Sequence, residues 1–583
     1  MSQVPASRTL KIAIAQANPV VGDIDSNVAL MRALRQQAAS QSAHLVCFSE
    51  LFVAGYPPED LVLKPAFGAA CKQASEAFAR ETSDGGPGVL FGTIWVEDGK
   101  RYNAAVVADA GRIAGVRFKC DLPNYGVFDE KRVFDAGPMP GPVLFRGVRL
   151  GVPICEDIWK EEVVECLVET GAELLISPNG SPFDASKPDI RMSIAVARVV
   201  ESGLPLVYVN QVGGQDELVF DGASFVLNGD RSLAVQMPAW RSALTLTDWS
   251  RAAGGEWRCA TGERALQPEG DAAVYQACML GLRDYVEKNR FPGVVLGLSG
   301  GVDSALVAAL AVDALGAERV HCVMLPYRFT SSDSLDDAAA VAKLLGCRYD
   351  TIDIAPSVEG FYRMTEPLFS GKPRDITEEN IQSRARGLTL MAVSNKLGSM
   401  LLTTGNKSEM SVGYATIYGD MNGGYNPIKD IYKMQVFSLC RWRNQHLPEG
   451  AKGPAGRVMP ERVITKAPSA ELRENQKDQD SLPPYEVLDG ILECLVEKEM
   501  PLHEIVARGF EASTVKRIEH LLNIAEYKRR QAAPGVKISQ RNFGRDRRYP
   551  ITNRFRESVE PPKDAANTRS GLVMPRADGG DAG

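Results

Sequence analysis

The sequence predicts the α/β fold class, with an N-terminal sandwich and a C-terminal domain built on a doubly wound parallel sheet. Three observations predict it. A β-branched apolar run at 294–297 precedes a glycine-rich turn and an apolar helical segment, the pattern of a buried parallel strand and its crossover helix. Helical and strand-like segments alternate after that turn. In the N-terminal half, three strand-like segments each end near a reactive side chain. The length of 583 residues is sufficient for two such domains.

Composition narrows the class of protein. The formal net charge of −7 suits a soluble protein and argues against bulk nucleic-acid binding. The 11 cysteines are scattered without a Cys-x-x-Cys pair, which disfavours a structural zinc site and a secreted disulfide framework. Residues 1–9 lack the apolar core of a signal peptide, and the longest apolar run, 294–316, contains two aspartates. We therefore expect a cytoplasmic location, no membrane segment and no nucleic-acid partner.

The first segments place a carboxylate at a strand end. Residues 10–15 are predicted to form a strand, residues 27–41 a helix, and residues 45–51 a second buried strand that carries Glu50 near its end. An apolar wall would raise the pKa of Glu50 and make it a usable proton acceptor. The alternative interpretation is an edge residue that faces water.

Two later strand ends carry an ammonium and a thiol. Lys119 ends a strand-like segment, and Cys155 stands at the next strand-to-turn junction. In an α/β sandwich these groups can converge with Glu50 and supply a base, an oxyanion partner and a nucleophile. Cys120 neighbours Lys119 on an extended segment, so its side chain is expected on the opposite face.

This half resembles the nitrilase and amidase superfamily, whose catalytic set is a glutamate, a lysine and a cysteine in this chain order. The resemblance covers roughly residues 8–250 and includes the stretches ELFVAGYPP and PICED. It implies an αββα sandwich with glutaminase activity. It further implies that Cys155 attacks the amide carbon, Glu50 takes the thiol proton and returns it to leaving ammonia, and Lys119 stabilises the tetrahedral oxyanion.

The same resemblance implies a supporting set around the catalytic residues. Glu130 would support the lysine. The glutamine-binding positions would be Tyr125, Glu130, Ser181 and Lys187. The competing interpretations are a surface charge at Glu130 and a loop-shaping role for each of the others.

The boundary between the two halves is assigned from composition. Residues 251–270 are polar and glycine-bearing without an apolar period and are predicted to be a linker. Residues 271–550 would form the second domain, entered by an amphipathic helix at 272–289. The Pro-, Gly-, Asp- and Ala-rich residues 557–583 are predicted to be a disordered tail.

The glycine-rich turn after residues 294–297 is predicted to be an anion cradle. Gly300 and Gly301 let the backbone approach a ligand, and the N–H groups of the following helix favour phosphate. The Walker-type and Gly-x-Gly-x-x-Gly motifs are absent. The stretch SGGVDS instead resembles the pyrophosphatase loop of ATP enzymes that adenylate a substrate. A nucleophile elbow, which the pattern Gly-x-Ser-x-Gly also fits, and a plain structural turn are the alternatives.

A second strand end can complete a nucleotide site. The stretch MLLTTGNKSE contains Thr404, which can bond a nucleotide, and ends in Glu409. Glu409 can ligate magnesium together with Asp303, since hard oxygen donors plus phosphates usually hold this ion. Alone, Glu409 would be interpreted as a charge at a helix N-terminus.

The two halves together resemble the glutamine-dependent NAD⁺ synthetase family, an amidase-like domain fused to an adenylating synthetase with an adenine nucleotide α-hydrolase-like fold. The resemblance covers about residues 8 to 550. The ATP-binding residues that it implies are Gly297, Leu298, Ser299, Gly300, Gly301, Val302, Asp303, Ser304, Thr404, Lys433 and Ser469. The implied deamido-NAD-binding residues are Asn380, Arg384, Glu409, Asp420 and Lys528, and the implied magnesium ligands are Asp303 and Glu409. Two positions depart from stand-alone synthetases: Tyr527 replaces a histidine and Ser469 a threonine.

The family resemblance implies ATP-dependent amidation of deamido-NAD⁺ to NAD⁺, with ammonia from glutamine, through an adenylate that releases AMP and pyrophosphate. ATP would be a substrate, magnesium a cofactor, and the assembly a homo-oligomer with a dimeric synthetase core. Three alternatives stay open: an amidotransferase that adenylates another acid, a carbon–nitrogen hydrolase with a nucleotide-sensing domain, and a non-catalytic assembly subunit. Residues 474–481 are expected to form a loop over the site, and the basic stretch 541–549 to pack or contact a phosphate.

Overall fold

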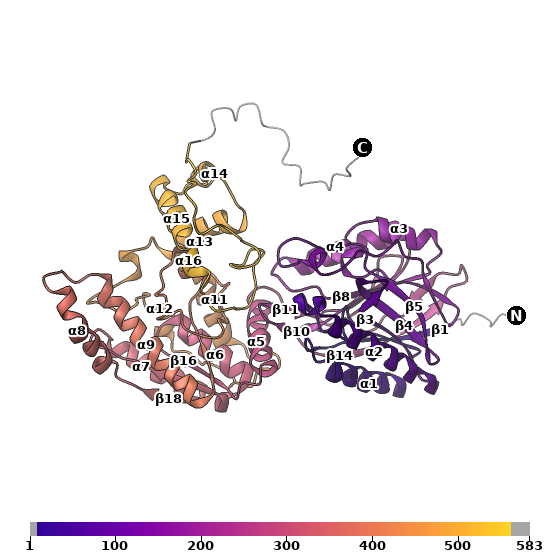
Figure 1. Cartoon of the computed structure of the whole chain (residues 1–583), viewed down its shortest axis with the longest axis horizontal. Coiled ribbons are helices and arrows are strands. Elements are labelled where there is room, and N and C mark those ends of the chain that lie inside the picture. The colour runs from indigo at the N-terminus through magenta and orange to yellow at the C-terminus, as the bar shows by residue number, and fades with distance from the viewer. Residues whose placement is uncertain (1–8, 561–583) are drawn as a thin grey trace.

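A computed structural model describes residues 9–560 of the chain. Figure 1 shows two α/β bodies side by side, the N-terminal half in indigo to magenta and the C-terminal half in pink to yellow. The tail expected at 557–583 lies outside the described residues except for 557–560, which form no helix or strand. No helix in the described part of the chain is long and apolar enough to cross a bilayer.

The N-terminal half is an αββα sandwich. Its first sheet has the order β15-β14-β1-β2-β3-β4-β5 and its second the order β13-β12-β9-β8-β7-β6. The first sheet comprises β1 (Thr9–Gln16), β2 (Leu45–Cys47), β3 (Gly88–Glu97), β4 (Lys100–Asp109), β5 (Arg112–Phe118), β14 (Ala243–Arg251) and β15 (Trp257–Cys259). The second comprises β6 (Val143–Phe145), β7 (Val148–Gly151), β8 (Leu174–Asn179), β9 (Leu206–Asn210), β12 (Phe225–Leu227) and β13 (Leu233–Gln236).

Alternating side chains build the layers of this sandwich. Ile12 and Ile14 point between the sheets, where they join Leu150 and Val207 of the second sheet. The intervening Ala13 faces outward into a cluster with two helices. These are α1 (Ile24–Ser40) and α2 (Pro65–Glu81), while α3 (Glu162–Glu169) and α4 (Lys187–Ser202) cover the second sheet. The predicted sandwich is confirmed.

The segment predicted to be a linker contains a strand. β15 pairs antiparallel with β14, and its Trp257 and Cys259 are buried in the core between the sheets. The strand has only two apolar residues, one on each side of Arg258. This alternation is too short to predict a strand within a polar stretch.

The C-terminal half holds a parallel sheet of four strands in the order β18-β17-β16-β19. The strands are β16 (Val294–Gly297), β17 (Val320–Met324), β18 (Arg348–Thr351) and β19 (Met400–Leu402). Helices lie on both faces, as Figure 1 shows, and confirm the doubly wound fold. They are α6 (Val302–Leu315), α7 (Ser332–Leu345), α8 (Ala355–Phe369), α9 (Ile376–Leu397), α11 (Lys433–Gln445) and α12 (Glu461–Thr465). The short α10 (Lys407–Val412) follows β19 and packs against the helical extension.

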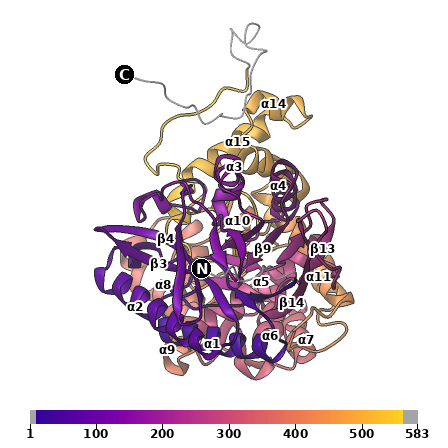
Figure 2. The ribbon, with the colours of Figure 1, turned by 90° about the vertical axis from the view of Figure 1, so that its right-hand side faces the viewer.

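A small helical extension completes this half. It comprises α13 (Tyr485–Leu492), α14 (Leu502–Ala507), α15 (Ala512–Ile524) and α16 (Glu526–Arg529). Its apolar residues form a cluster of their own with Met410 and Met421. Figures 1 and 2 both show α14 and α15 standing out from the main body.

The entry helix α5 (Gly270–Lys288) differs from the amphipathic helix that was expected. It is buried on nearly every side because it packs between its own domain and the hairpin of β10 (Val212–Gln215) and β11 (Leu218–Asp221). A Cβ atom on Gly214 would lie 3.0 Å from the Cα of Gly281, so the two backbones are in direct contact. Asp284 accepts hydrogen bonds from Asn18 Nδ2 and the Gly214 N–H, both at 2.6 Å.

Candidate active sites

The first candidate site lies at strand ends of the N-terminal sandwich. Glu50 follows β2, Lys119 follows β5 and Cys155 opens the turn after β7. Lys119 Nζ lies 2.8 Å from Glu50 Oε1 and 2.9 Å from Glu130 Oε2. Glu50 and Lys119 are fully buried, so both carboxylates share one ammonium away from water. The structure thus brings three of the residues predicted from the sequence into direct contact.

Cys155 sits on a strained turn beside this cluster. It has a φ of +47°, a left-handed conformation that a non-glycine residue adopts only when its surroundings impose it. Burial raises the pKa of the Cys155 thiol well above its ordinary value, and the charge of Glu50 raises it further, whereas Lys119 lowers it. The resting thiol therefore holds its proton, and Glu50 is the neighbouring carboxylate that could accept it.

The cluster is electrostatically coupled. Burial works against the charged form of Lys119, but the Glu130 and Glu50 carboxylates outweigh it and raise the pKa of the ammonium. Burial raises the pKa of Glu130 to about 7, although Lys119 opposes the shift. Lys119 therefore stays charged at neutral pH and can donate to a developing oxyanion.

Several residues that orient the cluster carry no signal in the sequence. Asn103 Nδ2 donates to Glu50 Oε1 at 2.7 Å, and the Gly180 N–H donates to Glu50 Oε2 at 2.8 Å. Tyr56 OH donates to Glu130 Oε1 at 3.0 Å. Cys120 is turned toward the backbone oxygen of Pro138, at 3.3 Å from its Sγ, in keeping with its expected opposite direction.

The expected glutamine-binding residues surround the thiol with both signs of charge. Lys187 Nζ lies 5.1 Å from the ring centre of Phe128, and burial lowers the pKa of this ammonium to about 8. Tyr125 OH lies 3.0 Å from both carboxylate oxygens of Glu156, a residue that the sequence interpretation missed. The Lys187 ammonium can pair with the α-carboxylate of an amino acid, and the Glu156 carboxylate can pair with its α-ammonium group.

Ser181 is held by a buried ion pair. Arg191 Nε donates to Ser181 Oγ at 3.0 Å, and Arg191 Nη2 donates to the Ser181 carbonyl at 2.9 Å. Arg191 in turn lies 2.7 Å from Asp221, with both side chains at most 5% exposed. Arg191 therefore fixes the loop that carries Ser181, although nothing in the local sequence marks it.

The second candidate site is a pocket of about 420 Å³ at the carboxyl ends of β16, β17 and β19. Most of the predicted nucleotide-site residues line it: Gly297, Leu298, Ser299, Gly300, Gly301, Val302, Asp303, Ser304, Asn380, Thr404, Glu409, Asp420, Lys433, Ser469 and Lys528. Gly300 has a φ of +80°, and a Cβ there would lie 2.3 Å from the Ser334 carbonyl. This turn therefore requires a glycine.

Arg384 does not reach the pocket. It is exposed on α9 and donates to the Ile417 carbonyl at 3.3 Å. Asn380, Ser383 and Gly387 line the pocket at helical spacing, so Arg384 is turned away by about 100° from Ser383. Tyr527 is also outside the lining and 46% exposed, whereas Lys528 beside it lines the pocket and donates to the Gly413 and Ala415 carbonyls.

The glycine turn does not have the surroundings of a nucleophile elbow. Ser299 Oγ lies 3.2 Å from Ser304 Oγ, and no histidine lines the pocket within the described range. His321 instead contacts Asp350 at 2.8 Å. A serine nucleophile would therefore have no histidine as its base here.

The predicted magnesium ligands share a lysine. Lys433 Nζ lies 2.5 Å from Asp303 Oδ2 and 3.2 Å from Glu409 Oε1. Burial raises the pKa of Glu409 to about 8, with Lys433 opposing the shift. Among residues 9–560 no group of three or more His, Cys, Asp or Glu side chains is arranged to hold a metal. Two carboxylates fit magnesium if phosphate oxygens and water complete its coordination.

Comparisons with known proteins match both halves. The carbon-nitrogen hydrolase family model matches residues 11–259, and the NAD synthase model matches residues 274–532. The glutamine-dependent NAD(+) synthetase of Rhodobacter capsulatus is 52% identical over 547 residues, which cover 94% of this chain and 99% of that protein. The synthetase of the same name from Thermotoga maritima is 41% identical over 583 residues, covering 95% of this chain and all of the relative.

Solved structures agree over nearly the whole chain. The glutamine-dependent NAD+ synthetase from Acinetobacter baumannii, in complex with ADP, has a TM-score of 0.74 and 43% identity and covers 94% of this chain and 99% of its own. The synthetase from Cytophaga hutchinsonii shares the fold, with a TM-score of 0.78 at 23% identity, covering 94% of this chain and 98% of its own. Because full-length relatives exceed 40% identity, this chain belongs to the glutamine-dependent NAD(+) synthetase family.

Proposed function

We propose that the chain amidates deamido-NAD⁺ to NAD⁺ with ATP and with ammonia that it releases from glutamine. The observation that carries the proposal is the presence, in one chain, of a buried Glu–Lys–Cys cluster and a separate pocket built on a glycine turn. Membership in the family supports it. Glutamine, ATP and deamido-NAD⁺ are the substrates, and glutamate, AMP and pyrophosphate accompany NAD⁺.

The first reaction takes place at Cys155. The thiol gives its proton to Glu50 and attacks the side-chain amide carbon of glutamine. Lys119 donates to the oxyanion that forms, and Glu50 returns the proton to the leaving ammonia. Water then releases glutamate from the thioester. Tyr125, Ser181 and Lys187 orient the substrate, and Glu130 keeps Lys119 in place.

The second reaction takes place in the pocket of the C-terminal domain. A carboxylate is a poor electrophile, because its oxygen is a bad leaving group. Attack of the deamido-NAD⁺ carboxylate on the α-phosphate of ATP makes an acyl-adenylate and pyrophosphate, and ammonia then displaces AMP. The glycine turn, Thr404, Lys433 and Ser469 hold ATP, and Asn380, Glu409, Asp420 and Lys528 contact deamido-NAD⁺.

Magnesium fits the carboxylates of Asp303 and Glu409. When bound, it offsets the negative charge of the phosphates. Lys433, which lies between both carboxylates, is the protein's own cation at this point. Ammonia would pass within the protein, since in water at neutral pH it becomes ammonium and loses its nucleophilicity. A cytoplasmic location and a homo-oligomer with a dimeric synthetase core complete the proposal, and the 11 free cysteines suit a reducing compartment.

A product assay tests the function. With ATP, deamido-NAD⁺ and glutamine, the protein should form NAD⁺, AMP and glutamate in equal amounts. If glutamate forms at the same rate with and without ATP, and no AMP is produced, the result would instead support a carbon–nitrogen hydrolase with a nucleotide-sensing domain. AMP formation with another acid but not with deamido-NAD⁺ would support a different amidotransferase.

A further inference from the structure

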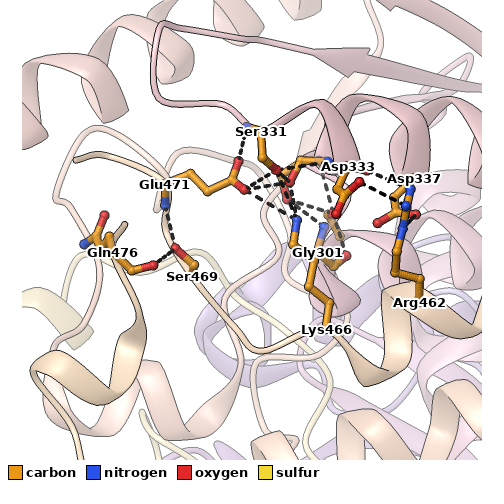
Figure 3. Close-up of polar contacts among 12 residues, drawn as sticks. Gly301, Ser331, Asp333, Asp337, Arg462, Lys466, Ser469, Glu471 and Gln476 are labelled. Atoms are coloured by element: carbon orange, nitrogen blue, oxygen red, sulfur yellow. Dashed lines mark hydrogen bonds and ion pairs between the residues drawn. The ribbon is translucent and has the colours of Figure 1, made fainter. Parts of the chain in front are cut away.

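A carboxylate of the chain itself occupies the N-terminus of α7, beside the glycine turn. Glu471 Oε1 accepts hydrogen bonds from Ser331 Oγ and Ser334 Oγ, both at 2.8 Å, and the Ser331 N–H reaches Glu471 Oε2 at 3.3 Å. Lys466 Nζ lies 3.4 Å from Glu471 Oε1 and 2.5 Å from Ser334 Oγ. Figure 3 shows Glu471 directed at Ser331 and Lys466. We call Ser331, Ser334 and Lys466 the α7 anion group.

The α7 anion group has the donors that proteins use for phosphate. Two hydroxyls, a backbone N–H, an ammonium and the positive end of a 14-residue helix converge on the Glu471 carboxylate. Ser334, Lys466 and Glu471 all line the nucleotide pocket. The Ser334 carbonyl lies 2.3 Å from where a Cβ of Gly300 would stand, so the group borders the glycine turn.

Other features indicate that another anion can replace the Glu471 carboxylate in this group. Glu471 has a φ of +49°, a strained conformation for a residue other than glycine. It belongs to the segment 466–484, which has no regular structure except a short turn at Asp478–Asp480. Arg462, by contrast, is held by Asp333 and Asp337 on the other side of α7, as Figure 3 shows. Lys466, in contrast to Arg462, has Glu471 as its single carboxylate partner, and Glu471 lies on a segment that can move away.

We propose that the α7 anion group binds the phosphates of ATP that leave as pyrophosphate, and that Glu471 is an internal competitor that these phosphates displace. This inference rests on the proposed function, because it takes ATP to be the occupant of the pocket. The triphosphate carries more charge than one carboxylate, so it gains more from Lys466 and the helix end. Its entry repels Glu471 and turns that side chain out of the α7 anion group, while Lys466 stays to bind the phosphates.

The test is calorimetric titration of the full-length protein with ATP, inorganic pyrophosphate and AMP. Glu471→Gln keeps the size of the side chain but removes its charge, so the Kd for ATP and pyrophosphate should fall by about two- to tenfold. Lys466→Ala should raise both Kd values by a similar factor. The Kd for AMP should change in neither variant, since AMP lacks the phosphates concerned. Glu474→Gln, an exposed carboxylate of the same segment, is the matched control and should bind like the wild type.

The outcomes separate this inference from the proposed function. If the wild type binds neither ATP nor pyrophosphate, the proposed function itself is wrong. If the wild type binds both but Glu471→Gln binds them equally or more weakly, Glu471 is not a competitor. If Lys466→Ala leaves the pyrophosphate Kd unchanged, the α7 anion group does not receive these phosphates. Limited proteolysis gives a second measure: cleavage within 466–484 should be faster in Glu471→Gln than in Glu474→Gln without ATP.

Discussion

The ammonium of Lys119 and the carboxylate of Glu50 form a 2.8 Å ion pair in which both side chains are fully buried. A buried pair is costly to form, but removing one partner costs more, because the other charge remains without compensation. Here Lys119 compensates Glu130 as well, at 2.9 Å. The catalytic cluster is therefore also a determinant of the stability of the N-terminal domain.

Lys119→Met should lower the free energy of unfolding of this domain by about 3–5 kcal/mol, because it leaves two buried carboxylates without their cation. The denaturant midpoint measured by tryptophan fluorescence is the readout. Lys160→Met removes an exposed partner of Asp121 and should cost less than about 1 kcal/mol. Equal midpoints for both variants would show that the buried pair adds no stability.

Cys155→Ala should lower glutamine-driven NAD⁺ formation by about a thousandfold or more, because the nucleophile is lost. NAD⁺ formation with ammonium chloride should persist, since the nucleotide pocket is built from other residues in the other domain. Cys120→Ala is the control, because its thiol faces Pro138 and should not matter for either nitrogen source. Loss of both activities in Cys155→Ala would contradict this division of labour.

The sequence predicted those site residues that stand directly after a strand. Glu50, Lys119 and Cys155 could be placed because each follows a strand, and the two packed sheets of the sandwich bring these strand ends together. The glycine turn could be placed because its order of residues is specific. Asn103 and Arg191 could not, since a single amide on a strand or an arginine on a helix has no distinguishing pattern. Position within the sandwich alone gives them their roles.

The relation between the domains was also beyond the sequence. Residues 272–289 suggested an ordinary amphipathic helix, yet α5 is buried on nearly all sides because the hairpin of the other domain covers its remaining face. A pattern within one helix cannot reveal a partner that is 70 residues away, as Gly214 is from Asp284. The family resemblance also implied that Arg384 contacts deamido-NAD, but its position on α9 places it outside the residues that line the pocket.

The Michaelis constant for glutamine should depend on pH through Lys187. Burial lowers the pKa of this ammonium to about 8, so its charge is present below pH 8 and is lost above it. If Lys187 holds the glutamine carboxylate, KM should rise by up to about tenfold per pH unit above pH 8. Lys187→Gln should show a high KM at pH 7 and a flatter profile, which also controls for titration of glutamine itself. A wild-type KM that is constant between pH 7 and 9 would exclude this role.

Asp303→Ala should abolish NAD⁺ formation from both glutamine and ammonia, because it removes a proposed magnesium ligand and a partner of Lys433. Chelation with EDTA should likewise stop AMP and pyrophosphate formation. Glutamate formation should continue in both experiments, since Cys155 lies in the other domain. Ammonia-driven turnover at the wild-type rate in Asp303→Ala would disprove the assignment.

The magnesium requirement should also vary with pH. Burial raises the pKa of Glu409 to about 8, and a carboxylate must lose its proton to bind a metal ion. The magnesium concentration for half-maximal pyrophosphate formation should therefore fall as the pH rises from 6.5 to 8. Glu409→Gln should need more magnesium and lose most of this pH dependence.

Asp284→Ala should uncouple the two reactions. The carboxylate on α5 is the acceptor for Asn18 Nδ2 and the Gly214 N–H of the other domain, so its loss leaves two donors without a partner, at about 1–3 kcal/mol each. The looser interface should let ammonia escape to solvent, and the ratio of glutamate to NAD⁺ should rise above one. Asp271→Ala on the same helix breaks a bond to Ser438 within the synthetase half and should keep the ratio at one. If Asp284→Ala also keeps a ratio of one, ammonia does not depend on this contact, and its path must be sought elsewhere along the domain boundary.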